Sequence, residues 1–452
     1  MKRVAIIALS LLLSANLGAD AHAEDQAAHL SIGDPARKDR EVPVILDGIT
    51  DAARGDTIGP SELAARLDGV KLVFVGENHT EMEFHRVQLR VLQELQRRGR
   101  KVLVGLEMYP VPEQKWLDRW YSDRGLTEEQ FLAESHWYGS WGYNWNYYRD
   151  IFLFAREHDI RMFAVNLPRA AVGVVRAKGF DSLTTEQRAM LPPTVDLENA
   201  AHRQLFRAFF GDEDALHGNM PPAMFEAMFR AQCAWDAAMG WNSVKALEKY
   251  GDGQSIMVVL IGSGHVAYGL GAEWQAKRWF QGRTASVVPI AIADEPNGKI
   301  LSSVRASYAD FVWGLPPATD PIYPATGIST PEAKSGERYK VINVATESPA
   351  EAAGIKTGDE LVSIDAMPLV DKEAFNRYMS TKRWGDALAY RVLRDGKELA
   401  LTVHLRRTPP KPAAADSLAT GGKAPEAPAH PAMPAMPSMP PMPPKPAGGG
   451  GK

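Results

Sequence analysis

Residues 72–79 read LVFVGENH, a short apolar run that ends in glycine and polar side chains. Such a run, bounded by turn-forming residues, is typical of a buried strand. The pattern returns far along the chain, where residues 256–265 read IMVVLIGSGH. In an open parallel α/β sheet the carboxyl ends of the strands share one edge, and ligands bind at that edge. The sequence therefore predicts that His79 and His265 face one cleft.

Further apolar runs alternate with helical patterns across the first 300 residues. Strands are expected at residues 72–75, 102–106, 160–165, 256–261 and 285–292, and helices from about Glu81 and at residues 113–120 and 128–134. This alternation indicates an α/β fold, a mainly parallel sheet flanked by helices. A Met- and Phe-rich helical lid subdomain is expected at about residues 184–250, either packed on the sheet or covering a flat apolar ligand. Thr80 and Glu83 predict a capping box for the first helix.

Composition shifts divide the chain into five parts. These are a signal peptide (1–23), an α/β domain (40–300), a linker (301–322), a small β-rich α+β domain (323–407) and a disordered Pro/Met-rich tail (408–452). The first part has two basic residues, an apolar run too short to span a bilayer and a small-x-small cleavage site. No lipobox cysteine follows it, and no later stretch predicts a transmembrane segment. We expect a periplasmic or secreted protein.

The overall composition excludes some partners and one kind of stabilisation. The chain is 45% hydrophobic and 23% charged with a net charge of -4, so no basic footprint for nucleic acid is present. Cys233 is the only cysteine, which rules out an intramolecular disulfide. In the tail, methionines at 433, 436, 439 and 442 recur every third residue among prolines. Their thioethers suit Cu(I), so copper capture is an alternative to a plain low-complexity extension.

The expected strand ends carry chemically active side chains. They present Glu77 with His79, then Glu107, then Arg169, then His265 with a nearby tyrosine. Histidines and carboxylates at one edge suit a divalent metal or acid/base chemistry. Tyrosine or histidine with arginine suits an iron porphyrin, because arginine pairs with the propionates. One such histidine would most simply satisfy backbone groups at a turn, whereas the whole set favours a functional cleft.

Two tyrosines lie beside strand-end motifs, and a phenolate is a suitable ligand for ferric haem. We favour Tyr268 as the axial ligand with His265 as hydrogen-bond partner or co-ligand, and Tyr109 is a second candidate. The alternative for Tyr268 is a partly buried side chain with a satisfied hydroxyl. Other histidines are expected to be ordinary surface or core residues: His85, His136, His158, His202 and His217.

Several motifs occur in a fixed order. They are VFVGENH at 73–79, GLEM at 105–108, WGYNW at 141–145, NLPR at 166–169, AQ at 231–232 with Trp235, Asp236 and Met239, and GHVAYG at 264–269. Together they resemble the ChaN-like haem-binding family, part of the Tiki/erythromycin-esterase-like superfamily. The resemblance implies an α/β fold with a helical subdomain, haem as cofactor, iron uptake, and haem pairs shared across a homodimer. Relatives are often lipoproteins, whereas this chain lacks the lipid-bearing cysteine.

The same superfamily also contains metal-dependent proteases and esterase-like enzymes. By that resemblance His79, Glu107 and His265 would bind a divalent metal such as Mn, Zn or Co. Glu77 and His79 would then be the catalytic residues, with Glu77 as the base. The residues alone leave a binding protein and a metal-dependent hydrolase open, and the binding protein is favoured.

Residues 348–361, SPAEAAGIKTGDEL, resemble a PDZ domain. A PDZ groove binds an extended chain end by adding it as a strand, and the helix at 372–379 would form one wall. Gly327 and Ile328 stand where the carboxylate-binding loop is expected, although their neighbours depart from its apolar-Gly-apolar pattern. The favoured function is an exported haem-binding protein of iron acquisition or haem trafficking whose PDZ domain recruits a protein partner. A hydrolase and a non-catalytic PDZ scaffold are the alternatives.

Overall fold

The structure is a computed structural model that describes residues 27–209, 221–292, 303–317, 321–330, 338–369 and 371–407. The expected signal peptide, the Pro/Met-rich tail with its proposed copper ligands, and His217 lie outside these residues. Among the helices of the described ranges, none has the length and apolar character needed to cross a membrane.

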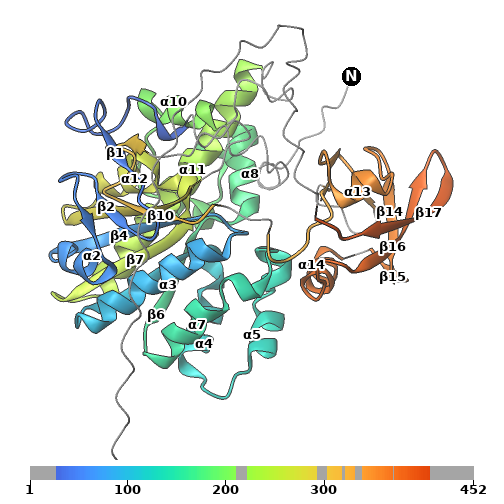
Figure 1. Cartoon of the computed structure of the whole chain (residues 1–452), viewed down its shortest axis with the longest axis horizontal. Coiled ribbons are helices and arrows are strands. Elements are labelled where there is room, and N and C mark those ends of the chain that lie inside the picture. Colours follow the sequence, from blue (N-terminus) through green and yellow to red (C-terminus); the bar gives the residue numbers. More distant parts are fainter. Residues whose placement is uncertain are drawn as a thin grey trace, which may run out of the picture. The chain divides into compact units, whose positions relative to one another are not determined.

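An eight-stranded sheet forms the centre of the first domain (Figure 1). Its strand order is β3-β2-β10-β8-β4-β7-β5-β6. The strands are β2 (Ile49–Asp51), β3 (Thr57–Ile58), β4 (Val70–Glu77), β5 (Lys101–Pro110), β6 (Arg161–Asn166), β7 (Ser255–Gly262), β8 (Arg283–Ala291) and β10 (Phe311–Leu315). Neighbours from β10 to β6 are parallel, and β2 and β3 add an antiparallel edge. The five predicted strands are β4 to β8, which confirms the α/β fold class.

Both faces of the sheet are covered, which explains why its strands read as continuous apolar runs. In β4, Val73 and Val75 pack on one face and Leu72 and Phe74 on the other. The first face is covered by α2 (Pro60–Arg66), α3 (Met82–Arg97), α4 (Gln114–Ser122), α5 (Glu128–Glu134) and α7 (Arg149–Glu157). The second face is covered by α10 (Ala200–Ala208), α11 (Pro222–Tyr250) and α12 (Ala272–Lys277). Figure 1 shows α3 and α11 on opposite sides of the sheet.

The Met- and Phe-rich region forms α9 (Thr185–Arg188), α10 and α11, and α8 (Arg169–Lys178) packs beside α11. The second half of α11 contacts the sheet through Met239, Val244 and Leu247. Its first half buries Met228 and Phe229 in a small separate cluster with Phe206. The described part of this region therefore packs largely within the domain, and a lid over a ligand stays a prediction.

The start of α3 corrects one expectation from the sequence. Its N-cap residue is Glu81, whose side chain makes no cap hydrogen bond, so the predicted capping box of Thr80 and Glu83 is wrong. Instead the side-chain amide of Asn78 donates to the Glu81 carboxylate at 3.0 Å. Because asparagine bonds locally in turns, it orders the connection in place of Thr80. This connection holds His79 between the end of β4 and the first turn of α3.

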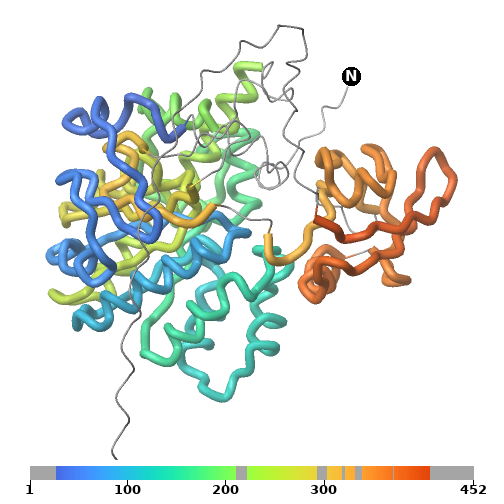
Figure 2. The backbone as a smooth tube through the Cα atoms, in the orientation of Figure 1, coloured from blue at the N-terminus to red at the C-terminus, as the bar shows by residue number. Residues whose placement is uncertain are grey.

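The N-terminal segment is part of the first domain. Strand β1 (Glu41–Pro43) pairs antiparallel with β9 (Ser303–Arg305), and Figure 2 shows this blue segment beside the later, yellow-orange chain. Ahead of β1, Ala27 and Ile32 are buried. Ser307 donates its hydroxyl proton to the Ile32 carbonyl at 2.7 Å. Segments far apart in sequence are thus joined on this side of the sheet.

The C-terminal part has its own core and is β-rich, as expected. Its elements are β11 (Ile328–Ser329), β12 (Tyr339–Lys340), β13 (Asn343–Val344), α13 (Pro349–Ala352), β14 (Glu360–Ile364), β15 (Met367–Pro368), α14 (Lys372–Ser380), β16 (Ala387–Arg394) and β17 (Lys397–His404). Strands β12, β14, β16 and β17 form one sheet, with β15 paired to β14. Ser348 caps α13 by accepting from the Glu351 amide, and Gly354 ends it with a φ of 80°.

Candidate functional site

The register of two neighbouring strands brings the two GxxH motifs together. Glu77 at the end of β4 pairs in parallel with Gly262 at the end of β7. A Cβ atom at Gly262 would lie 3.5 Å from His79 Cε1 and 3.7 Å from His265 Cδ2. The predicted convergence of the two imidazoles at the carboxyl edge of the sheet is therefore confirmed, while their chemical roles stay predictions.

Glu107, from the adjacent strand β5, reaches the same place. Its Oε2 accepts a hydrogen bond from the Gly262 backbone N–H at 2.6 Å. Its Oε1 lies 3.6 Å from His265 Nε2. One ligand atom each from Glu77, His79 and Glu107 lie within 4.8 Å of one another. Two carboxylates and imidazole nitrogen at this spacing are the ligand types that divalent transition metals bind.

A buried carboxylate orients His79. Its Nδ1 donates to Glu77 Oε1 at 2.6 Å, and the Tyr148 hydroxyl donates to the same oxygen at 3.1 Å. The other oxygen of Glu77 lies 2.9 Å from Nδ1 of His85, a buried histidine on α3. Since Nδ1 of His79 is used in this way, Nε2 is the nitrogen left for a ligand.

The second histidine is held by a similar arrangement built from different helices. Nδ1 of His265 donates to Asp236 Oδ1 on α11 at 2.6 Å. The other oxygen of Asp236 lies 3.4 Å from Nε2 of His202, which comes from α10. The side-chain amide of Gln232 also lies 2.9 Å from His265 Nδ1. Nε2 of His265 is again the nitrogen turned toward Glu107.

The charges of these groups are coupled through short contacts. Burial by itself would raise the pKa of Glu77, but His85 and His79 outweigh it and lower that pKa to about 2. Burial would lower the pKa of both site histidines. The hydrogen bond and charge of Glu77 raise the pKa of His79 instead, and Asp236 raises the pKa of His265 to about 9. In contrast, burial is the dominant effect on His202 and lowers its pKa.

Aromatic rings flank the more accessible of the two histidines. The His79 side chain is 26% exposed and that of His265 is 14% exposed. The ring centroids of Trp141 and Tyr143 each lie 4.9 Å from that of His79. Beside the second motif, a Cβ atom at Gly264 would lie 3.8 Å from the Phe209 ring. The remaining rings of the Trp137 to Tyr148 run are mostly buried, as expected for core.

The two tyrosines predicted as haem ligands have other partners. The Tyr268 hydroxyl donates to the Ala27 carbonyl at 2.7 Å and accepts from the Leu30 amide at 3.0 Å. Tyr109 is buried among aromatic rings, and its hydroxyl donates to Ser135 Oγ at 3.1 Å. Burial raises the pKa of both phenols, which disfavours the phenolate form. Their roles as ligands stay predictions that require these hydrogen bonds to be given up.

Arg169 and the PDZ residues complete the predicted set. Arg169 is the first residue of α8 and is exposed, so its pairing with propionates stays a prediction. In the PDZ region Gly327 has a φ of 80° and Ile328 begins β11. A groove there is lined by Ile328, Thr330, Tyr339, Leu361, Leu369, Lys372 and Phe375. The helix predicted as its wall, α14, supplies two of these side chains.

Sequence reasoning missed His85 and His202, which it assigned to ordinary surface or core positions. Both are buried, and each lies against the carboxylate that holds a site histidine. A usable signal was present for His85, because it lies in the first turn of the helix that follows His79. For His202 no local pattern pointed to Asp236, because the two residues come from different helices.

Two family descriptions match this chain. Residues 63–275 match "Haem-binding uptake, Tiki superfamily, ChaN". Residues 324–405 match the PDZ domain. The two matches leave the N-terminal segment and the tail outside both families.

Individual relatives are distant. The chain is 22% identical over 266 residues to the protein RETICULATA-RELATED 5, chloroplastic, of Arabidopsis thaliana, a match covering 55% of this chain and 34% of the plant protein. This chain thus spans about a third of that relative's length. A structure titled for cofacial heme binding to ChaN of Campylobacter jejuni has a TM-score of 0.46 and 14% identity, covering 60% of this chain and 98% of that one. The structure of an erythromycin esterase mutant, EreC, in its open conformation has a TM-score of 0.35 and 10% identity. This match covers 57% of this chain and 93% of the esterase chain.

Proposed function

Because residues 63–275 match the ChaN haem-binding family of the Tiki superfamily and residues 324–405 match the PDZ domain, we propose that this protein is exported and binds haem in iron acquisition or trafficking. The observation that carries the proposal is the pair of imidazoles at one sheet edge. Each has Nδ1 bound to a buried carboxylate, so that Nε2 is the donor left for iron.

The residues around the pair fit a haem group in chemical type. Haem needs a nitrogen or oxygen donor for its iron and apolar surface for its flat ring. His79 and His265 supply the donors, and the rings of Trp141, Tyr143 and Phe209 supply apolar surface beside them. When bound, haem would supply the iron, and the carboxylates of this chain would keep both imidazoles oriented.

We assign iron ligation to the histidines ahead of Tyr268. The Tyr268 hydroxyl already has a donor and an acceptor in the N-terminal backbone, and both hydrogen bonds would have to break before it met iron. The imidazoles need less rearrangement, because their carboxylate hydrogen bonds use Nδ1, and Nε2 of His265 has a longer contact of 3.6 Å with Glu107 Oε1. Histidine ligation therefore costs less reorganisation than tyrosine ligation.

Haem titration of the full chain tests the proposal. Wild-type protein should shift the Soret band and saturate at stoichiometric haem. His79→Ala and His265→Ala should weaken binding by about tenfold or more, which is at least about 1.4 kcal/mol. Tyr268→Phe should leave the spectrum unchanged, and exposed His158→Ala is the matched control. An unchanged haem spectrum with wild-type protein would remove the proposal.

The close approach of Glu77, His79 and Glu107 supports a second candidate, a metal-dependent hydrolase of peptidase or esterase type. A divalent metal there would supply an activated water. Both oxygens of Glu77 contact histidines, so it orients imidazoles in the present arrangement and would need to free one oxygen to act as a base. Stoichiometric Mn, Zn or Co by elemental analysis, lost in His79→Ala, would favour this candidate over haem.

For the PDZ domain we propose capture of a protein chain end in the groove between β11 and α14. The lining is mainly apolar, with Lys372 at one end of the helix. A free carboxyl-terminal peptide should bind in fluorescence polarisation, and its amidated form should bind at least about tenfold more weakly. Phe375→Ala should reduce binding, whereas haem titration of the same variant should match wild type. Equal affinity for free and amidated peptides would contradict chain-end capture.

A further inference from the structure

We propose that His85 and His202 are positioning residues, each of which holds the carboxylate that orients one site histidine. The inference rests on the proposed function in that it concerns the same pair of imidazoles, and it assigns work to two residues outside the strand-end motifs. In each case a carboxylate lies between the two histidines. Glu77 contacts His79 and His85. Asp236 contacts His265 and His202.

His85 faces hydrogen-bond acceptors with both of its ring nitrogens. Nδ1 lies 2.9 Å from Glu77 Oε2 and 3.4 Å from Gln88 Oε1. Nε2 lies 3.3 Å from the His79 carbonyl oxygen. The Gln88 amide nitrogen donates to Val75 O, so its oxygen is the atom turned to His85. Both ring nitrogens of His85 therefore face oxygen atoms that can only accept.

His85 therefore fixes the site at two points at once. One nitrogen contacts the carboxylate that orients the His79 ring, and the other contacts the His79 backbone. The Tyr148 ring, 4.4 Å away between centroids, packs against His85 and also donates its hydroxyl to Glu77. The histidine thus links helix α3 to the turn that carries His79.

His202 has the equivalent place in the second arrangement. Its Nε2 lies 3.4 Å from Asp236 Oδ2, and its Nδ1 lies 3.8 Å from the sulfur of Cys233. Its ring packs edge-on against Phe229 at a centroid distance of 5.0 Å. A thiol can donate to Nδ1, which leaves Nε2–H to point at the carboxylate. His202 is therefore placed to supply a donor to the outer oxygen of Asp236.

The consequence for the site comes from the carboxylates. Glu77 and Asp236 are buried, so an outer oxygen without a donor would carry a large desolvation penalty. The carboxylate would then rotate or recruit another partner, and the site histidine would lose its fixed Nδ1–H. Outer partners of this kind typically change metal affinity by about 10- to 100-fold. A histidine that merely fills core volume would leave the site imidazole unchanged.

Two readouts test the proposal on the full chain. Nitrogen-15 histidine labelling and NMR should show hydrogen-bonded Nδ1–H signals for His79 and His265 in the haem-free wild type. His85→Leu should weaken the His79 signal alone, and His202→Leu the His265 signal alone. Haem affinity should fall by about 10- to 100-fold in each. His202→Gln keeps a donor and should recover most of the loss, while exposed His158→Leu should change nothing.

The outcomes separate this inference from the proposed function. Wild-type protein that does not bind haem would contradict the haem proposal. The positioning roles would still hold if His85→Leu lost only the His79 signal and His202→Leu lost only the His265 signal. If His202→Leu does not fold, His202→Gln decides for that residue; if His85→Leu does not fold, the Nδ1–H signal of His79 in the wild-type spectrum decides. Unchanged Nδ1–H signals and haem affinity in folded His85→Leu and His202→Leu would overturn the inference, as would a wild type without ordered Nδ1–H protons.

Discussion

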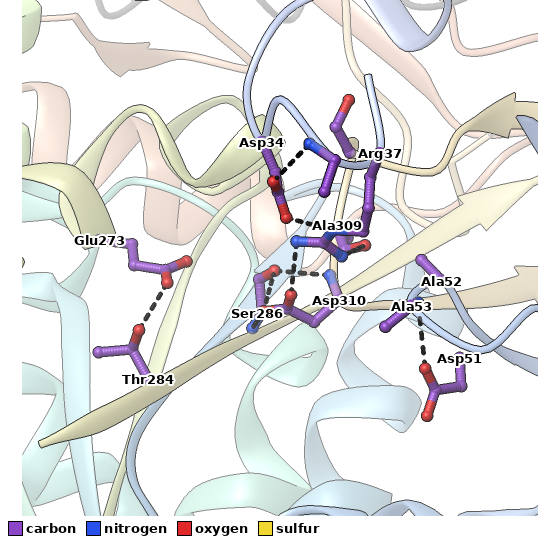
Figure 3. Close-up of polar contacts among 12 residues, drawn as sticks. Asp34, Arg37, Asp51, Ala52, Ala53, Glu273, Thr284, Ser286, Ala309 and Asp310 are labelled. Carbon is purple, nitrogen blue, oxygen red and sulfur yellow. Dashed lines mark hydrogen bonds and ion pairs between the residues drawn. The ribbon is translucent and has the colours of Figure 1, made fainter. Parts of the chain in front are cut away.

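Two polar clusters join other segments to the parallel sheet, and they are built in different ways. Asp310, just before β10, accepts from the Arg37 guanidinium and from the backbone and hydroxyl of Ser286 in the middle of β8, as Figure 3 shows. Arg37 also bonds Asp34 in the N-terminal segment. At the carboxyl ends, Glu77 and Asp236 instead contact imidazoles. The first cluster uses permanent charges and backbone donors, and the second uses groups that titrate.

The difference separates a structural cluster from a functional one. Arginine stays charged at any physiological pH, and backbone amides cannot leave, so the Asp310 cluster holds three segments in one arrangement. Histidine changes its charge near neutral pH and offers a second nitrogen to a ligand. In addition, the outer oxygens of Glu77 and Asp236 make no hydrogen bond of good geometry, although each contacts a histidine. Incomplete satisfaction of buried polar groups is typical of functional sites.

The largest expected effect is on stability and lies in the structural cluster. Asp310→Ala removes the ion pair with Arg37 and both hydrogen bonds to Ser286. Because these groups are only partly exposed, we expect a loss of about 3 kcal/mol in the free energy of unfolding, measured by urea denaturation. Haem affinity of the folded variant should equal that of wild type. If Asp310→Ala kept its stability but lost haem binding, the Asp310 cluster would be functional rather than structural.

The next effect is on binding and lies in the functional cluster. In His79→Ala the buried Glu77 keeps contacts with His85 and Tyr148, so stability should change by about 1 kcal/mol or less. Haem affinity should fall by at least about tenfold, or about 1.4 kcal/mol, because a donor nitrogen is lost. Isothermal titration and urea denaturation of the same preparation measure both quantities. A larger loss of stability than of affinity would assign His79 to structure.

Between pH 6.5 and 9, the functional cluster should contribute a pH dependence to the stability. The pKa of His265 is about 9, above its ordinary value of 6.5, so the folded state holds an extra proton in this range. The stabilisation is complete below pH 6.5 and is lost as pH rises through 9, with a slope of at most about 1.4 kcal/mol per pH unit. Urea denaturation across this range should show a shallower slope in His265→Gln, whereas Asp310→Ala should keep the wild-type slope.

The smallest expected effect is on stability and concerns a single hydroxyl in the structural cluster. Ser286→Ala removes the hydroxyl that donates to the Asp310 carboxylate and accepts from the Asp310 backbone N–H, and it keeps the bond from the Ser286 backbone. We expect a loss of about 1 kcal/mol in the free energy of unfolding, a third of the Asp310→Ala effect. Thermal melting at fixed pH measures it. Haem binding unlike that of wild type would show that the two clusters communicate.

The sequence predicted the frame of the first domain because the frame depends on local patterns. Five apolar runs became β4 to β8, and strand ends in a parallel sheet share an edge, so the meeting of His79, Glu107 and His265 followed from topology. The PDZ region was likewise predicted from the local resemblance of residues 348–361, which contain α13 and Gly354 in the structure. None of these inferences required knowledge of a side-chain contact.

The predictions that lacked support depended on contacts between distant segments. Tyr268 lies beside a strand-end motif, as predicted. Its hydroxyl nevertheless hydrogen-bonds the backbone of Ala27 and Leu30, because the N-terminal segment packs there. His202 lies against Asp236 only because α10 and α11 pack together. Thr80 and Glu83 have the spacing of a capping box, but the helix begins after Glu81, and a hydrogen bond from Asn78 to Glu81 orders the turn instead. A single sequence contains no periodic signal for such pairings.

The central claim is that the carboxylate-oriented imidazoles at the carboxyl edge of the sheet hold iron. Electron paramagnetic resonance of the ferric haem complex, made with nitrogen-15-labelled histidine in the full chain, tests it most directly. We expect hyperfine coupling from a histidine nitrogen that disappears in His79→Ala or His265→Ala and persists in Tyr268→Phe. Haem bound without histidine coupling, or coupling lost in Tyr268→Phe alone, would contradict the account.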